Sequence, residues 1–530
     1  MRRNSVQPVL VRKDLLRFRA GTPFGEITVS ATLAKTASWP RYPTVYEINT
    51  WVWLSELSKK YRTTVDLSSV PSAEWDAIAT YGFDAVWLMG VWERSPAGIA
   101  IANHNKALVE DFQCALSDLH ADDNVGSPYC VRGYAVDQHL GGPQALAIAR
   151  GELSERGIKL ILDFVPNHVA LDHPWVAKHP EYFIQGDSED AVNDPASYME
   201  SGGTVYARGR DPFFPAWPDV LQLNAFEPGL RQVALETVSR IAQQCDGIRC
   251  DMAMLFMNAI FKRTWGSRAG RPPATEYWTD MIPAVKKAYP GFIFIAEAYW
   301  DMEWELQQRG FDFCYDKKLY DLLEHSNAES IRLHLCADLA YQGKLLRFIE
   351  NHDEPRVAAA FSPAKRRAAA VTIATIPGMR LFHEGQFEGW MVRLPVFLGR
   401  RPAEAVDHEL HAFYTRLLAA IDRSIFREGQ WSLCDRTGWP DNASFQNLVA
   451  WNWWKDDERC LIIVNLSDSF AQGRVPVQWA DAGGGTWRLI DVLSDATYER
   501  DGDEMLSPGL YVELGPWNYH FFRCLRTNGR

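Results

Sequence analysis

The segment "LLRFIENHD" (residues 345–353) begins as an apolar run and ends in polar and acidic side chains. Its first half has the composition of a buried β-strand. The polar end continues through "EPR" (354–356), which adds another acid, a proline and an arginine. Enzymes built on parallel strands carry their chemistry where the strands end. The segment therefore predicts a buried strand that brings functional side chains to one edge of the fold.

Seven further runs share this character, being short, apolar, and rich in β-branched or aromatic residues. They are "TVYEINTW" (44–51), "DAVWLMG" (84–90), "KLILDFVPN" (159–167), "DGIRCDM" (246–252), "FIFIAEAY" (292–299), "FDFCYD" (311–316) and "MRLFHEGQ" (379–386). Helix-like segments lie between them, for example at 71–82, 142–157, 228–245 and 363–376. Eight strand–helix units in series predict an α/β fold, a parallel (β/α)₈ TIM barrel.

The domain organisation follows from where this alternation starts and stops. We predict an N-terminal extension at 1–42 and the catalytic barrel at 43–425. Two connections, 91–141 and 169–227, show no strong strand or helix pattern, and such long loops are usually functional. The second is predicted to form a loop subdomain beside the barrel. At 430–530 short alternating strands with turn residues predict a C-terminal antiparallel β-sandwich domain.

Composition narrows the function. The net charge is −12, from 55 basic and 67 acidic residues, which disfavours a nucleic-acid partner. No apolar run is long enough to span a membrane, and the basic N-terminus has no apolar core of signal-peptide length. The nine cysteines are scattered without a CxxC pair, which is typical of free thiols in a reducing compartment. We therefore expect a cytoplasmic protein.

Polar side chains follow four of the predicted strands. They are Asp163, Asn167 and His168 after strand 3, Arg249 and Asp251 on strand 4, Glu297 on strand 5, and His352 and Asp353 on strand 7. Each of them alone could be a structural cap, but together they indicate a site at one end of the barrel. Asp251, Glu297 and Asp353 can converge there, and two close carboxyl groups suit a retaining glycosidase. Arg249 precedes Asp251 by two residues, so both point to the same side of the strand.

These segments resemble the conserved blocks of the α-amylase family, glycoside hydrolase family 13. The resemblance covers roughly 44–425 and rests on one loop and on four blocks that stand in the family's order. They are "GSPYCVRGYAVDQHLGG" (126–142), "DFVPNH" (163–168), "DGIRCDMAM" (246–254), "IAEAYW" (295–300) and "ENHDEPR" (350–356). The C-terminal β domain is also similar to that of the family.

The resemblance implies a role for each matching residue. Asp251 would be the nucleophile, Glu297 the acid/base, and Asp353 the third carboxylate, which stabilises the transition state. Binding of the reacting sugar would fall to Arg249, His168, His352 and, as a stacking platform, Tyr134. No cofactor is required for this chemistry. The family also implies a structural calcium ion near Asn167 and Asp219; the two could equally anchor a loop and cap a turn.

The sequence also departs from the family. Met254 and Leu255 stand where many amylases carry a Lys-His pair, and Arg132 stands where many have a histidine. Both changes bear on subsite preference rather than on bond cleavage. The segment 385–402 carries Arg393, Arg400 and Arg401, which could bind phosphate or form a salt-bridged lid.

Three functions remain at this stage. The first is a retaining α-glycosidase acting on α-glucosidic bonds of an oligosaccharide or polysaccharide. The second is an α-glucan transglycosylase or a glycoside phosphorylase, in which the same glycosyl-enzyme passes its sugar to another acceptor. The third is a carbohydrate-binding protein without activity, which would be expected to have lost one of the three carboxylates. All three are present.

Overall fold

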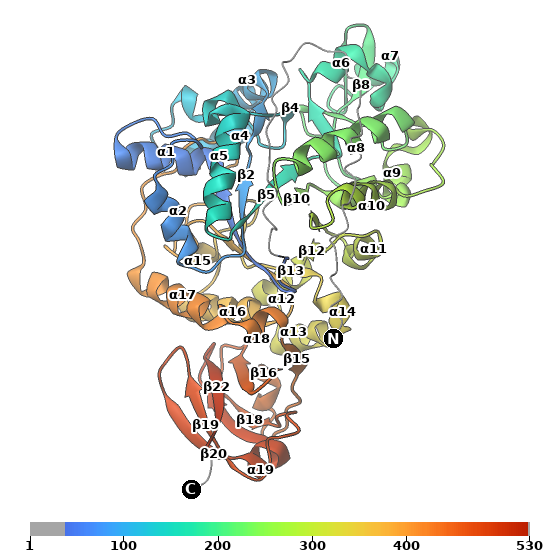
Figure 1. The fold of residues 1–530 in the computed structure, drawn as a ribbon. Coiled ribbons are helices and arrows are strands. Elements are labelled where there is room, and N and C mark those ends of the chain that lie inside the picture. The colour runs from blue at the N-terminus through green and yellow to red at the C-terminus, as the bar shows by residue number, and fades with distance from the viewer. Residues whose placement is uncertain (1–37, 528–530) are drawn as a thin grey trace, which may run out of the picture. The chain divides into compact units, whose positions relative to one another are not determined.

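The computed structural model describes residues 38–527. Residues 1–37, which make up most of the predicted N-terminal extension, lie outside the described residues. Figure 1 shows the described chain as a barrel region followed by an antiparallel β region near the C-terminus.

Eight parallel strands form a closed barrel, and each contains part of one predicted run. They are β1 (Thr44–Asn49), β2 (Ala85–Met89), β5 (Lys159–Phe164), β10 (Gly247–Cys250), β11 (Ile293–Ala296), β12 (Phe313–Tyr315), β13 (Leu345–Arg347) and β14 (Met379–His383). The barrel runs in the order β1-β14-β13-β12-β11-β10-β5-β2, and β1 pairs with both β2 and β14. The predicted (β/α)₈ barrel is therefore confirmed.

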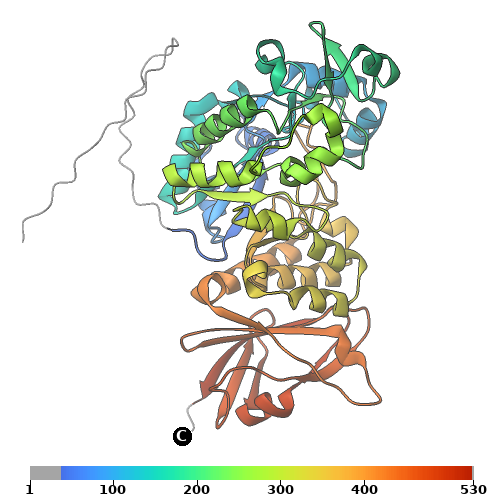
Figure 2. The same ribbon diagram turned by 90° about the vertical axis from the view of Figure 1, so that its right-hand side faces the viewer.

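Helices cover the outside of the strands, as Figure 2 shows from the side. The four predicted segments are α2 (Ser72–Ala79), α5 (Gly142–Glu155), α8 (Pro228–Ala242) and α16 (Pro363–Thr375). The last three have proline in the first turn, where a missing N–H is least costly. The others around the barrel are α1 (Thr50–Tyr61), α9 (Asn258–Trp265), α10 (Tyr277–Ala288), α11 (Glu303–Gln308), α12 (Lys317–His325), α13 (Ala328–Leu335), α14 (Leu339–Gln342), α15 (Val357–Ala360), α17 (His408–Ile421) and α18 (Ser424–Glu428).

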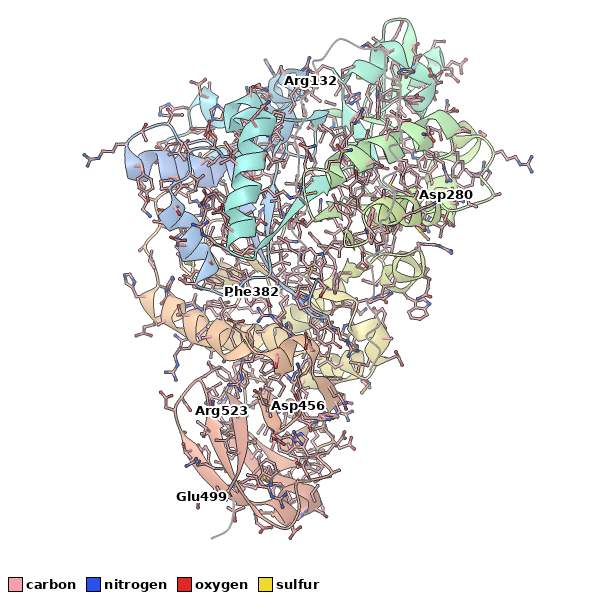
Figure 3. The ribbon with its side chains drawn as sticks, viewed as in Figure 1. Arg132, Asp280, Phe382, Asp456, Glu499 and Arg523 are labelled. Atoms are coloured by element: carbon pink, nitrogen blue, oxygen red, sulfur yellow. The ribbon has the colours of Figure 1, made fainter. Side chains whose placement is uncertain are left out.

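Alternate residues of each strand face the barrel interior. In β11, Ile293 and Ile295 belong to the interior apolar cluster, whereas Phe294 packs in the larger cluster between strands and helices. Phe382 of β14, labelled in Figure 3, is of this outward kind and makes an edge contact with Tyr414 of α17. This period of two decides which side chains reach the end of the barrel.

The first long connection, 91–141, is not structureless, so that expectation was wrong. It contains β3 (Trp92–Arg94), α3 (Pro96–His104), α4 (Lys106–Ala115) and β4 (Val131–Val136). A small apolar cluster explains its order, since Ala102, Phe112 and Leu116 pack against Leu398, which lies beyond β14. The buried apolar residues of α3 and α4 find a packing partner in that distant segment.

The second connection, 169–227, is a small subdomain with its own strand pairs. β6 (His168–Ala170) pairs with β9 (Val220–Gln222), and β7 (Tyr198–Ser201) with β8 (Thr204–Ala207). The β7–β8 turn is Gly202-Gly203, and both glycines have positive φ, as a two-residue hairpin turn requires. Two short helices, α6 (Pro174–Lys178) and α7 (Ser188–Asn193), complete it.

The C-terminal region consists of antiparallel strands. A six-stranded sheet comprises β15 (Gln430–Leu433), β16 (Leu448–Lys455), β17 (Glu458–Asn465), β22 (Tyr519–Thr527), β19 (Thr486–Asp491) and β20 (Thr497–Asp501). The pair β18 (Ala471–Val475) and β21 (Leu510–Leu514) packs on one face of this sheet across a shared apolar core. The short helix α19 (Gly502–Glu504) precedes β21.

The other face of the six-stranded sheet packs against α13, α16 and α18 of the barrel. Trp453 is fully buried there, and its indole N–H donates to the Thr375 carbonyl at the end of α16 over 2.6 Å. This side chain joins the two regions through both apolar contact and a hydrogen bond.

Replacing Trp453 should destabilise the chain strongly. Trp453→Ala removes a buried indole, a change that typically costs about 3–5 kcal/mol, and it leaves the Thr375 carbonyl without this donor. We expect the melting temperature, measured by differential scanning fluorimetry, to fall by several degrees. Trp439→Ala is the control, because Trp439 is 36% exposed. Equal shifts for the two variants would contradict this account.

Candidate active site

A cleft of about 340 Å³ opens at the carboxyl ends of the barrel strands. It is lined by Ser127, Tyr129, Cys130, His168, Trp217, Asp219, Val220, Asp251, Met252, Glu297, Tyr299, Asp353 and Phe397. The three carboxylates predicted to converge are therefore brought together, although they come from three different strand ends.

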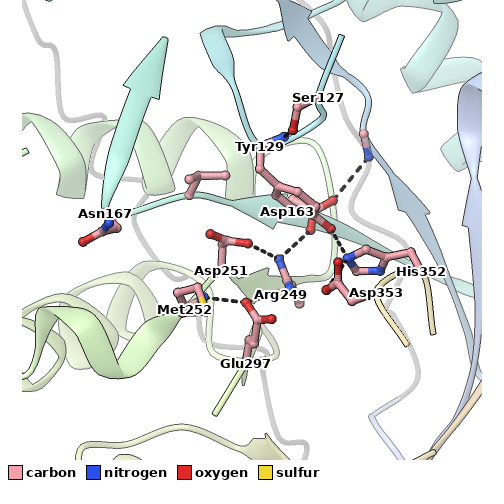
Figure 4. A network of polar contacts seen from close by, with 12 residues as sticks. Ser127, Tyr129, Asp163, Asn167, Arg249, Asp251, Met252, Glu297, His352 and Asp353 are labelled. Carbon is pink, nitrogen blue, oxygen red and sulfur yellow. Dashed lines mark hydrogen bonds and ion pairs between the residues drawn. The ribbon is translucent and has the colours of Figure 1, made fainter. Parts of the chain in front are cut away.

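The Arg249 guanidinium lies among these acids, and Figure 4 shows it next to Asp163 and Asp251. It is 1% exposed and forms ion pairs of 2.7 Å with Asp251 and 2.8 Å with Glu297. Asp163 is 3.7 Å from the same guanidinium. One buried cation thus orients both proposed reacting carboxyl groups.

Strand periodicity explains how these side chains arrive. Ile161 and Asp163 on β5, and Ile295 and Glu297 on β11, form inward-facing rows that change from apolar to acidic at the strand end. Arg249 and Asp251 form the corresponding row on β10. Asp163 also accepts hydrogen bonds from the Trp87 indole at 3.1 Å and the Gly90 amide at 3.3 Å, which fix its carboxylate.

The carboxyl groups have different proton affinities. Burial, reinforced by the nearby Asp251 and Asp353 charges and opposed by Arg249, raises the pKa of Glu297 to about 7. Burial also raises the pKa of Asp251, although Arg249 opposes it through charge and a hydrogen bond. For Asp353, the partial loss of solvent acts upward, but the His352 imidazolium outweighs it and lowers the pKa to about 2. Near neutral pH the geometry therefore favours an ionised Asp353 and a Glu297 able to carry a proton.

The segment after β13 reaches the cleft by a turn. Asn351 accepts hydrogen bonds from the amides of Asp353 and Glu354, both at 2.9 Å, in an Asx-type turn. The turn breaks the strand alternation, so His352 and Asp353 lie side by side, with Nε2 and Oδ2 3.0 Å apart. The Asp353 side chain is 40% exposed, whereas His352 is buried. Glu350 is fully buried and pairs with Arg356 at 2.7 Å.

Tyr134 was predicted as the stacking platform, and the structure corrects this. Its hydroxyl donates to the Val165 carbonyl at 3.0 Å and accepts from the Val165 amide at 2.9 Å. Its ring packs against Trp92 and Phe164, and it does not line the cleft. Tyr129 lines the cleft instead, with the Arg249 guanidinium 5.0 Å from its ring centre.

Tyr129 and Tyr134 occur in the same sequence block. Tyr134 lies in strand β4, whereas Tyr129 lies in the preceding turn. Tyr129 also contacts His352, with its hydroxyl 2.6 Å from Nε2. The backbone turn places Tyr129 in the cleft while the ring of Tyr134 packs against neighbouring side chains, and the sequence pattern did not predict this turn.

His168 lies at the predicted edge, on the cleft wall beside Trp217, with ring centres 5.1 Å apart. Burial lowers the pKa of His168 to about 4, so it is neutral near neutral pH. A neutral imidazole can donate one hydrogen bond and accept another, which suits contact with sugar hydroxyls.

The two proposed calcium ligands are placed differently. The Asn167 carboxamide is paired at both ends with Gln222, which accepts at 3.2 Å and donates at 2.9 Å. Asp219 lies on the cleft wall, and its carbonyl accepts from the Cys130 thiol. Among residues 38–527 no group of three or more His, Cys, Asp or Glu side chains could hold a metal ion. Calcium binding stays a prediction, the residues present do not form a cage for it, and no step below uses it.

The residues that depart from the family pattern after Asp251 are buried and do not line the cleft. Met254 and Leu255 are buried in the 3₁₀ turn η4 (Ala253–Phe256), whereas Met252 reaches the cleft. Met252 has a left-handed backbone with φ +42°, and its amide donates to Glu297 at 2.6 Å. This unusual conformation for a non-glycine residue turns the chain directly after Asp251 so that its N–H meets the acid.

The arginines of segment 385–402 are paired with acids. Arg400 contacts Asp118 at 3.1 Å and Asp123 at 2.6 Å, both in the connection after β2. Arg393 lies 3.3 Å from Asp111, and Arg401 pairs with Glu384. Arg132, labelled in Figure 3, pairs with Glu93. These contacts favour the salt-bridged lid over a phosphate site.

Comparison with known proteins agrees with the fold. The family model "Alpha amylase, catalytic domain" matches residues 73–488. The fold and the site define an α-amylase-type barrel, and the chain belongs to the α-amylase family. In residues 38–527, no helix is long and apolar enough to cross a membrane.

Among curated relatives, the alpha-amylase MalA of Haloarcula japonica is 27% identical over 65% of this chain and 44% of its own length. Alpha-amylase 3 of Dictyoglomus thermophilum is 24% identical over 48% of this chain and 52% of its own. An alpha-1,4-glucan:maltose-1-phosphate maltosyltransferase of Rhodospirillum rubrum is 26% identical over 42% of this chain and 27% of its own. The chain thus spans about half or less of these relatives' lengths.

Solved structures confirm the fold. A noncanonic maltogenic alpha-amylase AmyB from Thermotoga neapolitana aligns with a TM-score of 0.64 at 17% identity, covering 92% of this chain and 99% of that one. An alpha-glucosyl transfer enzyme, XgtA, aligns with a TM-score of 0.64 at 16% identity, covering 92% and 99%. At these identities the likeness shows the fold alone.

Exchanging each tyrosine for phenylalanine should separate the two roles. Tyr129→Phe removes the hydroxyl at His352, so we expect a loss of about tenfold in kcat/KM on a maltooligosaccharide with little change in melting temperature. Tyr134→Phe should instead lower the melting temperature, because the Val165 amide and carbonyl lose their partner. Steady-state kinetics and thermal melts of both variants check this. The reverse pattern would restore Tyr134 as the cleft tyrosine.

Proposed function

We propose that this chain is a retaining α-glycosidase that cleaves α-glucosidic bonds of α-glucans or maltooligosaccharides through a covalent glycosyl-enzyme. The observation that carries this proposal is the single buried arginine that bridges Asp251 and Glu297. Arg249 orients the Asp251 carboxylate for attack, while burial and the nearby acids raise the pKa of Glu297, so that Glu297 can hold a proton. An oligosaccharide or polysaccharide is the expected partner.

In the first step, the Asp251 carboxylate attacks the anomeric carbon as the glycosidic C–O bond breaks. Glu297 donates its proton to the departing oxygen, which leaves as a sugar hydroxyl. The Met252 amide and the Tyr299 hydroxyl, 2.6 Å and 3.0 Å from the Glu297 oxygens, orient the acid and accommodate the charge it gains. The products of this step are an Asp251–sugar ester and an ionised Glu297.

In the second step, Glu297 takes a proton from water while the water oxygen attacks the anomeric carbon. The ester bond breaks, Asp251 regains its carboxylate, and Glu297 regains its proton. Two inversions at one carbon retain the α configuration. Asp353 and the adjacent His352 would bind hydroxyls of the reacting ring, most strongly as it flattens toward an oxocarbenium ion.

Transfer to another sugar is the second candidate, and named maltosyltransferase relatives support it. The cleft walls contain Trp217, Val220 and Phe397, which suit a sugar face better than an anion. Ionised Asp251 and Asp353 in the same cleft would repel phosphate. We therefore place water or a neutral sugar ahead of phosphate as the acceptor.

We also propose the predicted domain division, with the barrel at 43–425, its 169–227 subdomain, and the β domain at 430–530. A cytoplasmic location is proposed as well, because all nine cysteines are unpaired.

The pH dependence should identify the acid. Glu297 is active while protonated and its pKa is raised to about 7, so kcat/KM should fall as the pH rises through about 7. Glu297→Gln should abolish this alkaline limb, and its residual activity should be best on substrates with good leaving groups. A pH profile on an aryl α-glucoside tests this. An alkaline limb that persists in Glu297→Gln would assign the proton donor elsewhere.

The nucleophile and the acceptor are tested together. Asp251→Asn should lower kcat by about a thousandfold or more, whereas Asp280→Asn, a change at a half-exposed acid of α10, should not. With maltooligosaccharides, proton NMR of the wild-type reaction should show the α anomer first, with the same products whether or not phosphate is present. Initial β anomer would refute double displacement, and a sugar phosphate would establish phosphorolysis.

A further inference from the structure

A second acid lies behind the proposed catalytic groups, on the first strand of the barrel. Glu47 of β1 is 0% exposed, and its Oε1 contacts Nδ1 of His352. Its neighbours Tyr46 and Ile48 pack on the outer side of the strand, so Glu47 faces the interior. The contact joins β1 to the segment that follows β13, with only β14 between the two strands in the barrel.

The two acids at the imidazole favour a proton on both ring nitrogens. Nδ1 faces the Glu47 carboxylate, and Nε2 faces Asp353 Oδ2 at 3.0 Å. A neutral histidine has only one N–H, so one carboxylate would then face a nitrogen lone pair. Only the imidazolium donates to both acids. The Tyr129 hydroxyl, 2.6 Å from Nε2, can accept from the same N–H.

The surrounding charges are consistent with this state. Burial alone would lower the pKa of His352, but Asp353 and Glu47 outweigh it and raise that pKa well above its usual value. The other charged or titratable groups that interact with His352 or with its two acids, Glu47 and Asp353, are Asp163, Arg249, Tyr315, His383 and Arg393. Of these, only Arg249 and Arg393 are permanently cationic, and Arg249 is already engaged by three carboxyl groups.

Stability alone gives no reason for an acid at position 47. Its second oxygen, Oε2, is buried without a hydrogen-bond partner among the described residues. A buried carboxylate with an unpartnered oxygen is destabilising, because that oxygen has lost its water without gaining a donor. What the acid supplies is a negative charge at Nδ1, which an amide of the same shape would not.

We propose that Glu47 is a positioning residue that acts through His352. It holds the ring as an imidazolium, so that the Nε2–H orients Asp353 and keeps it ionised for sugar binding. The proposal rests on the proposed glycosidase function for its effect on turnover, but not for its effect on the histidine.

The direct test is the titration of His352 in intact protein with isotope-labelled histidine, followed by NMR. His352→Gln assigns the signal among the 13 histidines. In the wild type we expect an imidazolium that persists above pH 7. In Glu47→Gln, where the amide N–H can donate to Nδ1, the His352 pKa should fall by at least about one unit. An unchanged titration would overturn the proposal whatever the enzyme turns over.

Kinetics supply the second readout. His352 has a raised pKa, so its contribution is present at low pH and is lost as the pH rises through that value. Lowering it in Glu47→Gln should move the alkaline limb of kcat/KM to lower pH and steepen it, since two groups then lose protons there. At pH 7, kcat should fall about tenfold or more, whereas KM should change by a smaller factor. A parallel loss at all pH values would indicate a purely structural role and contradict the proposal.

Two further variants secure the interpretation. Glu303→Gln is the matched control, because Glu303 is 4% exposed on α11 and faces His334 rather than the cleft; it should leave the His352 titration unchanged. Glu47→Asp keeps the charge but withdraws it by one methylene, so the His352 pKa should lie between wild type and Glu47→Gln. A pKa in Glu47→Asp as low as in Glu47→Gln would show that charge is not what position 47 supplies. If the His352 titration shifts as expected but neither the wild type nor any variant has glycosidase activity, the proposed function is wrong and the role of Glu47 toward His352 stands.

Discussion

The ion pairs of the buried Arg249 guanidinium set the chemistry of the site. Four carboxyl groups interact with it, those of Asp163, Asp251, Glu297 and Asp353, and a fifth, that of Glu47, contacts His352. Arg249 and His352 are the buried cations of this group, and the half-exposed Arg393 faces Asp353. The carboxyl groups outnumber the buried cations and burial opposes the ionised form, so a carboxyl group here can hold a proton at moderate pH. Glu297 is favoured because it is buried and feels both Asp251 and Asp353.

The barrel makes this crowding tolerable by holding each acid on a different strand. On β5 and β11 the inward-facing side chains change from isoleucine to an acid at the strand end. The isoleucines pack in the barrel interior. The cation and its acids are therefore fixed by strands, while the adaptable cleft walls come from the connections after β2 and β5 and from the segment after β14. Salt bridges of Arg393 and Arg400 to the first of these connections tie two of those walls together. This division keeps the reacting groups rigid while the walls vary.

Much of this could be predicted from the sequence because strand periodicity is local. The eight apolar runs were placed correctly, and the acids at their ends converge as expected. Glu47 was missed although it interrupts an apolar run, "TVYEINTW". The role of a single inward-facing acid depends on its contact with His352, which lies 305 residues away in the sequence. The tyrosine was misassigned for a related reason. Turn geometry, not spacing, decides that Tyr129 faces the cleft, and an Asx turn at Asn351 decides that Asp353 does.

The central claim is that Asp251 becomes covalently bonded to the sugar while Glu297 manages the proton. Trapping tests it most directly. Glu297→Gln should form the ester from an activated α-glycosyl fluoride, which needs no acid, but hydrolyse it slowly for lack of a base. Mass spectrometry of a rapidly quenched reaction should then show the added sugar mass on the peptide that contains Asp251. A sugar attached to any other residue, or rapid turnover with no adduct and a product of inverted configuration, would contradict the account.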